Sequence, residues 1–513
     1  MNEEVVDVLI VGAGISGIGA GYHLQAKCPN RSYTILERRE SLGGTWDLFR
    51  YPGIRSDSDM YTLGYSFRPW TDPKAIADGP SILKYVRETA EAYGIDKKIQ
   101  YGFHVKRASW SSEDSTWTVE AQREGSGEIC RFRCNFLFMC SGYYNYDAGY
   151  TPDFEGREDF AGQVVHPQKW TSDIAYEGKR VVVIGSGATA VTLVPELARK
   201  AAHVTMLQRS PTYMVSAPSE DSFANWARRQ FPTSFAYGLT RWKNVLLGTA
   251  FFNFCRRWPE RAKRLLRKGL ERHIRPDFDL DRHFTPPYNP WDQRMCLVPD
   301  ADFFDALNED RISIATEHID RFTEKGILLR SGEELEADLI VTATGLDLQL
   351  MSGIEISVDG EAIDPSQSMT YKSMMFSDIP NLALSFGYTN ASWTLKCDLT
   401  CEYVTRLLNH MDAKGYTRCT PRRDDPSVEI EQMLNLTSGY IMRSVDAFPK
   451  QGSKAPWRLY QNYLLDKLTI GFASIEDKSL EFGSSPQRAS NVFEIAGKGA
   501  PVEKTAASGS IAP

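Results

Sequence analysis

The fold is decided by the stretch Val8-Leu9-Ile10-Val11-Gly12-Ala13-Gly14-Ile15-Ser16-Gly17, in which the pattern Gly-x-Gly-x-x-Gly directly follows an apolar strand. Gly12 permits a tight turn, Gly14 lets the backbone approach a pyrophosphate, and Gly17 allows the next helix to pack closely on the strand. The N-terminus of that helix faces the negative charge of the phosphates. The stretch therefore predicts a dinucleotide-binding unit of the Rossmann type.

A carboxylate stands after the next expected strand, at the spacing that a ribose requires. Residues 32–36 form this strand, and Glu37 lies twenty residues after Gly17 (37 − 17 = 20). A carboxylate at this spacing accepts hydrogen bonds from the two ribose hydroxyl groups. The first unit therefore favours a dinucleotide with an unphosphorylated ribose, FAD or NAD. The alternative interpretation is a glycine-rich turn that holds no ligand.

The same design returns in the segment Arg180-Val181-Val182-Val183-Ile184-Gly185-Ser186-Gly187-Ala188-Thr189-Ala190. Gly185, Gly187 and Ala190 take the three small positions. Two such units in one chain predict two nucleotide-binding domains.

The second unit differs from the first after its second strand. Residues 203–207 are followed by Gln208-Arg209-Ser210, and Arg209 stands nineteen residues after Ala190 (209 − 190 = 19). An arginine at this place removes the repulsion toward a ribose 2′-phosphate and can pair with it. We therefore expect NADP here, held by Arg209 and Ser210, with a surface arginine at a strand end as the alternative. One FAD and one NADPH in a chain imply that hydride transfer reduces the flavin.

Composition limits the class of partner and the surroundings. The chain has 513 residues and a formal net charge of −7 at pH 7, whereas a nucleic-acid binder needs a basic footprint, so small molecules are the expected partners. The acidic start leaves no room for a signal peptide, and no apolar run reaches the ~18 residues of a membrane span. Nine scattered cysteines, an odd number, fit reduced thiols, and we expect a cytoplasmic protein.

Two pairs of cysteines have a spacing that would place each pair on one helix face. These pairs are Cys130/Cys134 and Cys397/Cys401. Neither has a nearby histidine, so we interpret them as small buried residues and expect no metal site.

The expected fold class is α/β, with two Rossmann-like dinucleotide-binding domains, for FAD and for NADP, and a helical insertion. Alternating apolar residues at 117–121 predict antiparallel strands, and the aromatic and basic segment 216–290 lacks such alternation. The expected ranges are 1–145 and 376–480 for the FAD-binding domain, 146–215 and 291–375 for the NADP-binding domain, 216–290 for the helical insertion and 481–513 for a flexible tail.

Three further patterns accompany the two glycine-rich turns. The first is Phe160-Ala161-Gly162-Gln163-Val164-Val165-His166-Pro167-Gln168-Lys169-Trp170, just before the second unit. The second is Gly43-Gly44-Thr45-Trp46, followed by Tyr51-Pro52-Gly53 and by Asp57, and the third is Asp338 with Ala343-Thr344-Gly345. Residues 38–110 contain no cysteine, which excludes the redox pair of a disulfide reductase.

With these patterns in this order, the chain resembles the class B flavoprotein monooxygenases of the Baeyer–Villiger type. Trp170 separates that type from the N-hydroxylating and dimethylaniline-type relatives, while Thr171 departs from the usual proline or aspartate. Four more stretches resemble most the mycobacterial, ethionamide-activating branch of the family, whose members oxidise linear and aryl ketones and the sulfur of thioethers and thioamides. These stretches are residues 51–61, 141–147, 288–294 and 387–396.

The resemblance implies a reaction and its residues. NADPH reduces the flavin, dioxygen adds to give a peroxyflavin, and this oxidant converts a ketone to an ester. By position Arg294 matches the active-site arginine, whose fixed charge stabilises the anions that develop, and Asp57 matches its acidic partner. Gly44, Trp46 and Asp57 belong to the cofactor-binding pattern, and Gln293 replaces a lysine that in relatives helps to hold the NADP phosphate. A surface arginine and a structural turn aspartate are the alternatives.

His166 and Trp170 are expected to couple the two domains. A histidine in a linker holds two domains in register more often than it acts as a general base, and NADP must move between two poses during turnover. The general base is the alternative for His166.

Two other functions stay open at this point. A heteroatom monooxygenase would oxidise sulfur or amine nitrogen with the same cofactors. A non-catalytic nucleotide-binding regulator would keep the fold, although the second nucleotide site and Arg294 speak against it.

The segment 241–272 is strongly basic in an acidic protein. It contains ten Lys/Arg and two Glu, a net charge of +8 (10 − 2), and it is interleaved with aromatic residues. A basic, aromatic helix can lie on anionic lipid, so peripheral membrane contact is one interpretation. A solvated face over a substrate-gating insertion is the other.

Overall fold

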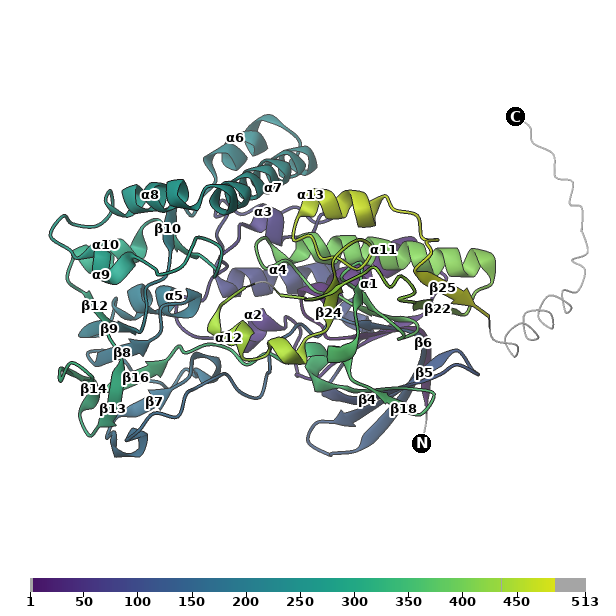
Figure 1. Cartoon of the computed structure of the whole chain (residues 1–513), viewed down its shortest axis with the longest axis horizontal. Helices are drawn as coiled ribbons and strands as arrows, with labels where there is room; N and C mark the ends of the chain where they lie inside the picture. Colours follow the sequence, from purple (N-terminus) through teal and green to yellow (C-terminus); the bar gives the residue numbers. More distant parts are fainter. Residues whose placement is uncertain (1–2, 435, 485–513) are drawn as a thin grey trace, which may run out of the picture.

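Two sheets organise the chain, one in each of two lobes (Figure 1). The computed structural model describes residues 3–434 and 436–484. The first lobe, on the right of Figure 1, contains the beginning and the last third of the described chain, and the second lobe contains most of its middle. Each lobe is therefore built from separate segments, as the sequence predicts.

The first sheet has the order β18-β17-β4-β5-β6-β1-β2-β3, with β21 beside β6. Strand β1 pairs in parallel with β2 and with β6, and α1 (Ile15–Lys27) joins β1 to β2, so the first predicted unit is present. Trp117, Val119 and Ala121 of β5 are fully buried, as their alternation predicts. The strands are β1 Glu4–Val11, β2 Tyr33–Glu37, β3 Ile99–Tyr101, β4 Phe103–Ser111, β5 Thr116–Arg123, β6 Ile129–Met139, β17 Glu355–Val358, β18 Glu361–Ile363 and β21 Leu382–Leu384.

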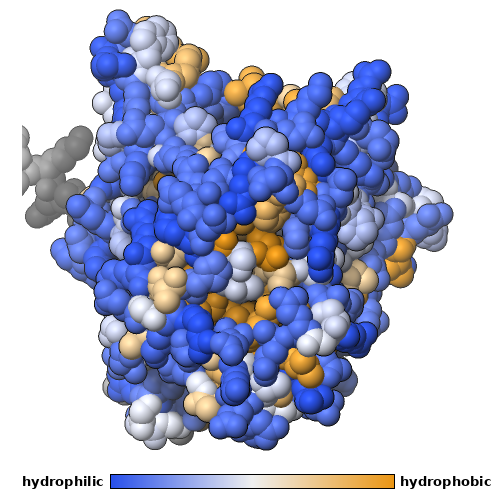
Figure 2. Space-filling view, turned by 90° about the vertical axis from the view of Figure 1, so that its left-hand side faces the viewer, coloured by the Kyte–Doolittle hydropathy of each residue, from blue (hydrophilic) through white to orange (hydrophobic). Residues whose placement is uncertain are grey.

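The second sheet is parallel throughout, in the order β12-β9-β8-β16-β7. Residues 181–184 of β8 are all buried, because elements cover both faces of a parallel sheet. Helix α5 (Ala188–Leu197) follows β8 and completes the second predicted unit. Seen from this lobe, the surface is mostly hydrophilic around a recessed apolar area (Figure 2). The strands are β7 Gln163–Val165, β8 Arg180–Ile184, β9 His203–Gln208, β12 Ile312–Thr316 and β16 Leu339–Thr342.

The predicted helical insertion consists of four helices between two paired strands. Strands β10 (Met214–Ala217) and β11 (Cys296–Pro299) pair in parallel at its base. The helices are α6 Ser222–Gln230, α7 Thr233–Arg257, α8 Pro259–Leu270 and α9 Leu280–Phe284. Helices α6, α7 and α8 lie along the upper edge of the molecule in Figure 1.

The remaining elements are mostly short and fill the space around the two sheets. The helices are α2 Thr45–Leu48, α3 Met60–Leu63, α4 Gly79–Ala92, α10 Asp302–Asn308, α11 Trp393–Lys414, α12 Gly439–Met442 and α13 Tyr463–Asp466. The strands are β13 Ile319–Thr323, β14 Gly326–Leu329, β15 Glu334–Glu336, β19 Thr370–Tyr371, β20 Met375–Phe376, β22 Arg418–Pro421, β23 Ile430–Gln432, β24 Lys450–Gly452 and β25 Leu480–Gly483.

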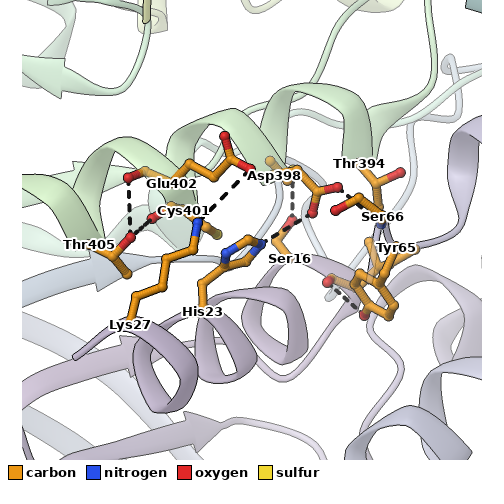
Figure 3. Close-up of polar contacts among 12 residues, drawn as sticks. Ser16, His23, Lys27, Tyr65, Ser66, Thr394, Asp398, Cys401, Glu402 and Thr405 are labelled. Atoms are coloured by element: carbon orange, nitrogen blue, oxygen red, sulfur yellow. Dashed lines mark hydrogen bonds and ion pairs between the residues drawn. The ribbon is translucent and has the colours of Figure 1, made fainter. Parts of the chain in front are cut away.

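Polar contacts join the long helix α11 to α1 at the centre of the first lobe (Figure 3). His23 of α1 points toward Asp398, with 3.6 Å between Nε2 and Oδ1. One helical turn further along, Lys27 reaches Glu402 at 4.0 Å. These contacts fix the register of the two helices that pack on the face of the first sheet.

Asp398 also anchors the insertion, because its second oxygen faces a cation from α7. Arg241 Nη2 lies 3.3 Å from Asp398 Oδ2, and Arg241 Nη1 donates to the carbonyls of Tyr61 and Gly64 at 2.8 Å each. Burial alone would raise the pKa of Asp398, but the neighbouring His23 ring and the charge of Arg241 outweigh it and lower that pKa. The insertion is thus held to the first lobe by a buried ion pair.

Three expectations from the sequence need correction. Strand β17 pairs with β4, so the chain returns to the first lobe before residue 355 and not at 375, because a strand pattern does not tell which sheet a strand joins. Strand β25 pairs with β22, so the tail cannot begin at 481, and residues 485–513 lie outside the described residues. Cys130 and Cys134 lie on strand β6 and not on a helix. Alternating buried residues in this segment favour a strand, although the spacing of the two cysteines also fits a helix.

We predict that Arg241→Met lowers the free energy of unfolding by about 3–5 kcal/mol, because it leaves the buried Asp398 carboxylate without its cation. Urea unfolding followed by tryptophan fluorescence measures the change. The double variant Arg241→Met/Asp398→Leu should recover a large part of the loss. Arg261→Met, at an exposed position of α8, is the matched control and should change stability by less than about 0.5 kcal/mol. An equal loss in the double variant would contradict the ion-pair explanation.

Candidate active site

A single cavity of about 1050 Å³ is lined by both glycine-rich turns and therefore lies between the two lobes. Its size is at the upper end of the ~300–1,000 Å³ that small-molecule sites usually have, as two nucleotides would require. Twelve of the predicted site residues line it. They are Gly12, Gly14, Glu37, Gly44, Trp46, Asp57, Gly185, Gly187, Arg209, Ser210, Gln293 and Arg294.

The first turn leaves room for a ligand only because its glycines lack side chains. Gly12 has a φ of +102°, and a Cβ there would lie 2.7 Å from the carbonyl oxygen of Cys140. A Cβ at Gly17 would lie 1.9 Å from the carbonyl oxygen of Gly12, so the helix packs against the turn as predicted, although Gly17 itself lies outside the cavity wall. A Cβ at Gly14 would lie 3.5 Å from the Cα of Gly44, so the backbones of the two glycines lie close together on the cavity wall. The turn fits a bound pyrophosphate.

Glu37 lies at the end of β2, buried but at the cavity wall. Its carboxylate accepts hydrogen bonds from the backbone N–H groups of Ala13 and Arg39, at 2.8 and 2.9 Å. Burial raises the pKa of Glu37 in spite of these two bonds. Ser141 lines the same wall, and its buried Oγ has no hydrogen-bond partner among the described residues. Both groups fit a ligand that brings hydroxyl groups to this end of the cavity.

The second turn repeats this construction. Gly185 has a φ of +132°, and a Cβ there would lie 2.3 Å from the carbonyl oxygen of Ala343, whereas Gly187 faces open space. Ala190 is fully buried and packs in the core of the second lobe rather than lining the cavity. Ser186 Oγ donates to the carbonyl oxygen of Ser210 at 3.0 Å and so ties the turn to the end of β9.

Arg209 stands at this end of β9 with its side chain exposed. Within the described chain its guanidinium makes no ion pair and no hydrogen bond. A free guanidinium beside a nucleotide-binding turn is available for a ribose phosphate. Gln293 lines the same cavity but carries no charge.

The two catalytic residues that the sequence predicts form an ion pair. Arg294 Nη2 lies 3.2 Å from Asp57 Oδ2, and each side chain is 34% exposed toward the cavity. The charge of Asp57 raises the pKa of Arg294, with further contributions from Tyr440, Tyr143 and Tyr144 that outweigh burial. Arg294 is therefore a permanent cation on the cavity wall.

The loop that carries Arg294 is fixed at both ends of its turn. Trp291 adopts a left-handed φ of +70°, and Asp292 accepts the backbone N–H of Asn289 at 3.0 Å. The carbonyl oxygen of Asp292 accepts the backbone N–H of Thr437 at 2.9 Å. This bond joins the arginine loop to the segment that carries Tyr440.

Three tyrosines near Arg294 were not predicted as site residues. Tyr143 and Tyr144 follow β6, and their hydroxyl groups lie 3.2 Å apart. Tyr143 stacks on Trp393 at 5.2 Å between ring centroids. The stretch 141–147 carried the family resemblance and could have indicated the first two tyrosines, but no pattern in the sequence marks Tyr440.

A buried ion pair supports another part of the cavity wall. Lys396 Nζ lies 2.8 Å from Asp466 Oδ2, and both side chains are almost completely buried. Tyr388, which lines the cavity, donates its hydroxyl to the same oxygen at 2.7 Å. Burial lowers the pKa of Lys396, although Asp466 opposes this effect. The pair fixes the position of the Tyr388 ring.

His166 and Trp170 lie away from the cavity wall. His166 Nε2 is 3.1 Å from the carbonyl oxygen of Gly345, and its Nδ1 accepts the backbone N–H of Gln168 at 3.1 Å. Nε2 thus joins residues 166–168 to the segment returning to the first lobe, and Nδ1 caps the short turn that follows His166. Trp170 is buried beside Tyr176. These contacts agree with a coupling role, and they leave no free nitrogen for a general base.

No group of three or more His, Cys, Asp or Glu side chains in the described parts of the chain could hold a metal ion. All nine cysteines are free thiols.

Two nucleotide-binding turns that share one cavity with a fixed arginine define a dinucleotide-dependent oxidoreductase. The chain belongs to the flavin-binding monooxygenase-like family, whose model matches residues 6–351. Flavin binding and monooxygenase chemistry, both expected from the sequence, are thereby confirmed.

Curated relatives extend over nearly the whole chain. The FAD-containing monooxygenase EthA of Mycobacterium tuberculosis is 54% identical over 484 residues, which cover 94% of this chain and 99% of the relative. The putative FAD-containing monooxygenase MymA of the same species is 49% identical over 95% of this chain and 99% of its own. The probable FAD-binding monooxygenase AlmA of Acinetobacter baylyi is 46% identical over 94% of this chain and 96% of its own.

Solved structures share the fold. An oxidized steroid monooxygenase bound to NADP superposes with a TM-score of 0.73 and 23% identity, over 93% of this chain and 99% of that chain. A closed cyclohexanone monooxygenase superposes with a TM-score of 0.70 and 19% identity, over 94% of this chain and 100% of that chain. The two-lobed architecture with two nucleotide-binding units is confirmed.

We predict that acidification weakens the fold through His166. Burial lowers the pKa of His166 in spite of the hydrogen bond to Gly345, and Lys169 adds to the lowering. The unfolded chain then binds a proton more readily, so the stability from the neutral ring is present above about pH 6.5 and is lost as the pH falls below it.

His166→Asn is the test, because asparagine can accept the Gln168 N–H but does not titrate in this range. Thermal midpoints measured from about pH 8 to 5.5 should fall less steeply in the variant than in the wild type. The other histidines are common to both proteins and cancel. Parallel curves would contradict the assignment.

Proposed function

We propose that this enzyme is an FAD-containing, NADPH- and O2-dependent Baeyer–Villiger monooxygenase that converts linear or aryl ketones to esters, and that it also oxidises the sulfur of thioethers or thioamides. The observation that carries the proposal is the Arg294–Asp57 pair, at 3.2 Å, on the wall shared by both nucleotide-binding turns. The relatives' names and the NADP-bound neighbour support the two cofactors.

The two turns assign one nucleotide to each lobe. Gly12, Gly14 and Glu37 contact FAD, with Gly44 and Trp46 on the same cavity wall, while Gly17 lets α1 pack closely behind the turn. The second nucleotide, NADPH, is held by Gly185, Gly187, Arg209 and Ser210, with Gln293 on the same cavity wall, while the small Ala190 packs in the core behind the turn. His166 and Trp170 keep the lobes in register while NADPH moves. The nine free thiols support a reducing, cytoplasmic setting.

When bound, FAD and NADPH supply the two electrons that reduce one atom of dioxygen to water while the other atom enters the substrate. The chain contributes a cation at a fixed place. As oxygen attacks the ketone, negative charge develops on the carbonyl oxygen, and a preorganised guanidinium stabilises it without reorganising. Asp57 orients this guanidinium, and the tyrosines around it exclude water from the reacting atoms.

A heteroatom monooxygenase is the second candidate, since sulfur oxidation creates no carbonyl anion and does not need Arg294 in the same way. Parallel assays with an aliphatic ketone, a phenyl ketone and a thioether, read by product mass, separate the two. Ester from ketones supports the first proposal, and sulfoxide without any ester supports the second. A protein that binds no flavin and consumes no NADPH would be a nucleotide-binding regulator.

We predict that Arg294→Ala lowers kcat for ketone oxidation by about 10²–10³-fold, because one preorganised group that stabilises the transition-state charge is lost. NADPH should still reduce the flavin in this variant. The loss of flavin absorbance in the absence of oxygen measures this reduction. Arg294→Lys should recover part of the rate.

The matched control is Arg38→Ala, since Arg38 also lines the cavity but pairs with Glu124 and Asp147 instead of Asp57. Unchanged ester formation in Arg294→Ala would rule out the catalytic assignment.

We also predict that Arg209→Ala raises the KM for NADPH by at least about tenfold. A charge-assisted hydrogen bond to the phosphate contributes about 1.5 kcal/mol or more to binding. The KM for NADH, which lacks that phosphate, should change little. Steady-state kinetics with both coenzymes measures the difference. An equal rise for both would transfer the phosphate contact to another residue.

A further inference from the structure

Helix α7 has an unusual distribution of polarity. Its exposed face from residue 233 to 250 includes Phe235, Leu239, Trp242 and Leu246, which are 58%, 38%, 41% and 51% exposed. Their spacing of four, three and four residues places them on one stripe of the helix. A surface helix normally turns such a stripe toward the core, so this stripe has another partner.

The charged residues of the same helical segment point the other way. Arg241 is buried against Asp398, and Lys243 is partly buried and pairs with Asp221 at 2.6 Å. Apart from these two, the segment 233–250 contains no charged residue. The helix thus presents apolar side chains to the outside and its cations to the inside.

Neighbouring helices extend the stripe into a larger surface. Phe231 contacts Phe235 at 5.3 Å between ring centroids, and Tyr463 of α13 contacts Trp242 at 5.9 Å. We call the following exposed side chains the apolar rim: Trp226, Phe231, Phe235, Leu239, Trp242, Leu246, Leu247, Trp258, Leu265, Leu465, Leu468 and Phe472.

The figures place the apolar rim on one edge of the molecule. Helices α6, α7, α8 and α13 all lie along the top of Figure 1. The upper edge of Figure 2, at the same height, shows apolar patches that interrupt the hydrophilic surface. Exposed apolar side chains gathered along one edge in this way mark a binding surface in a folded protein.

Unpaired cations border the apolar rim. Five exposed basic side chains at the end of α7, along α8 and just after it form no ion pair and no hydrogen bond within the described residues; they are Arg257, Arg261, Arg264, Lys268 and Arg272. Leu266 and Leu270 hold the opposite face of α8 against the protein. The whole protein has a net charge of −7. The charge at this edge is therefore opposite in sign to the net charge of the protein.

We propose that the apolar rim and the five cations form a docking surface for an anionic lipid bilayer, with α7 lying in the membrane interface. Aromatic and aliphatic side chains enter the boundary between headgroups and acyl chains, while the cations bind the anionic headgroups. In the described part of the chain no helix is long and apolar enough to cross a membrane, and the contact is therefore peripheral.

A lipid surface fits this edge better than a protein partner does. Five cations with free side chains need counter-charges spread over two helices, which a bilayer of anionic headgroups provides without a complementary shape. The surface also continues to the active site, because Phe252 of α7 contacts Trp291 at 5.4 Å and Arg256 pairs with Asp292 at 2.6 Å. Docking therefore brings the loop of Arg294 close to the bilayer.

Vesicle flotation with the full-length flavoprotein tests the proposal. Vesicles of phosphatidylcholine with phosphatidylglycerol should carry the protein upward, and pure phosphatidylcholine vesicles should carry at least about tenfold less, because each basic residue near an anionic surface favours binding. High salt should weaken the contact.

Two variants separate the apolar and the charged contributions. Phe235→Glu/Leu246→Glu and Arg261→Glu/Arg264→Glu should each lower binding by at least about tenfold, with flavin content and turnover of a water-soluble ketone unchanged. The matched control Val5→Glu/Ile430→Glu changes two exposed apolar residues elsewhere and should bind as the wild type does.

Two outcomes would overturn the proposal. Protein that stays with the soluble fraction in the presence of phosphatidylglycerol vesicles excludes lipid docking. A dimer that Phe235→Glu/Leu246→Glu abolishes, without any vesicle binding by the wild type, would assign the apolar rim to a second copy of the chain.

Discussion

The structure depends on holding one positive charge at a fixed place between two nucleotide-binding turns. Arg294 cannot lose its charge, because Asp57 lies 3.2 Å away and the surrounding tyrosines also favour the cation. Its position depends in turn on contacts from three segments: the turn at Trp291, the backbone bond from Thr437 to Asp292, and the ion pair between Arg256 and Asp292. The cavity wall, the segment of Tyr440 and helix α7 are therefore parts of one arrangement around this guanidinium.

Much of the fold could be predicted because backbone geometry restricts sequence at the turns. A Cβ at Gly12 or Gly185 would collide with a backbone carbonyl, so only glycine serves there and the pattern is visible. The alternation in β5 and the apolar run in β8 are similarly direct consequences of burial on one face or on both. The change of lobe near residue 355 could not be predicted, because β17 has the same local pattern whichever sheet receives it.

The candidate site divides in the same way. Glycines, Glu37 and the pair Arg294 and Asp57 were found because spacing or family patterns mark them, and the structure brings them to one cavity. Tyr440 comes from a segment almost 150 residues after Arg294, and its place depends only on tertiary packing. The surface at α7 and α8 could be anticipated only in part: the sequence shows that residues 241–272 are basic and aromatic, but not that Arg241 is buried or that the apolar stripe begins at Phe235.

The most direct measurement follows labelled oxygen. The purified protein is mixed with NADPH, an aliphatic ketone and dioxygen made of heavy oxygen, and the product is weighed by mass spectrometry. The account predicts an ester that contains one heavy oxygen atom per molecule, formed by the wild type and nearly absent with Arg294→Ala. Two results would contradict this assignment. One is consumption of NADPH without any labelled ester from the ketone, and the other is a purified protein that contains no bound flavin.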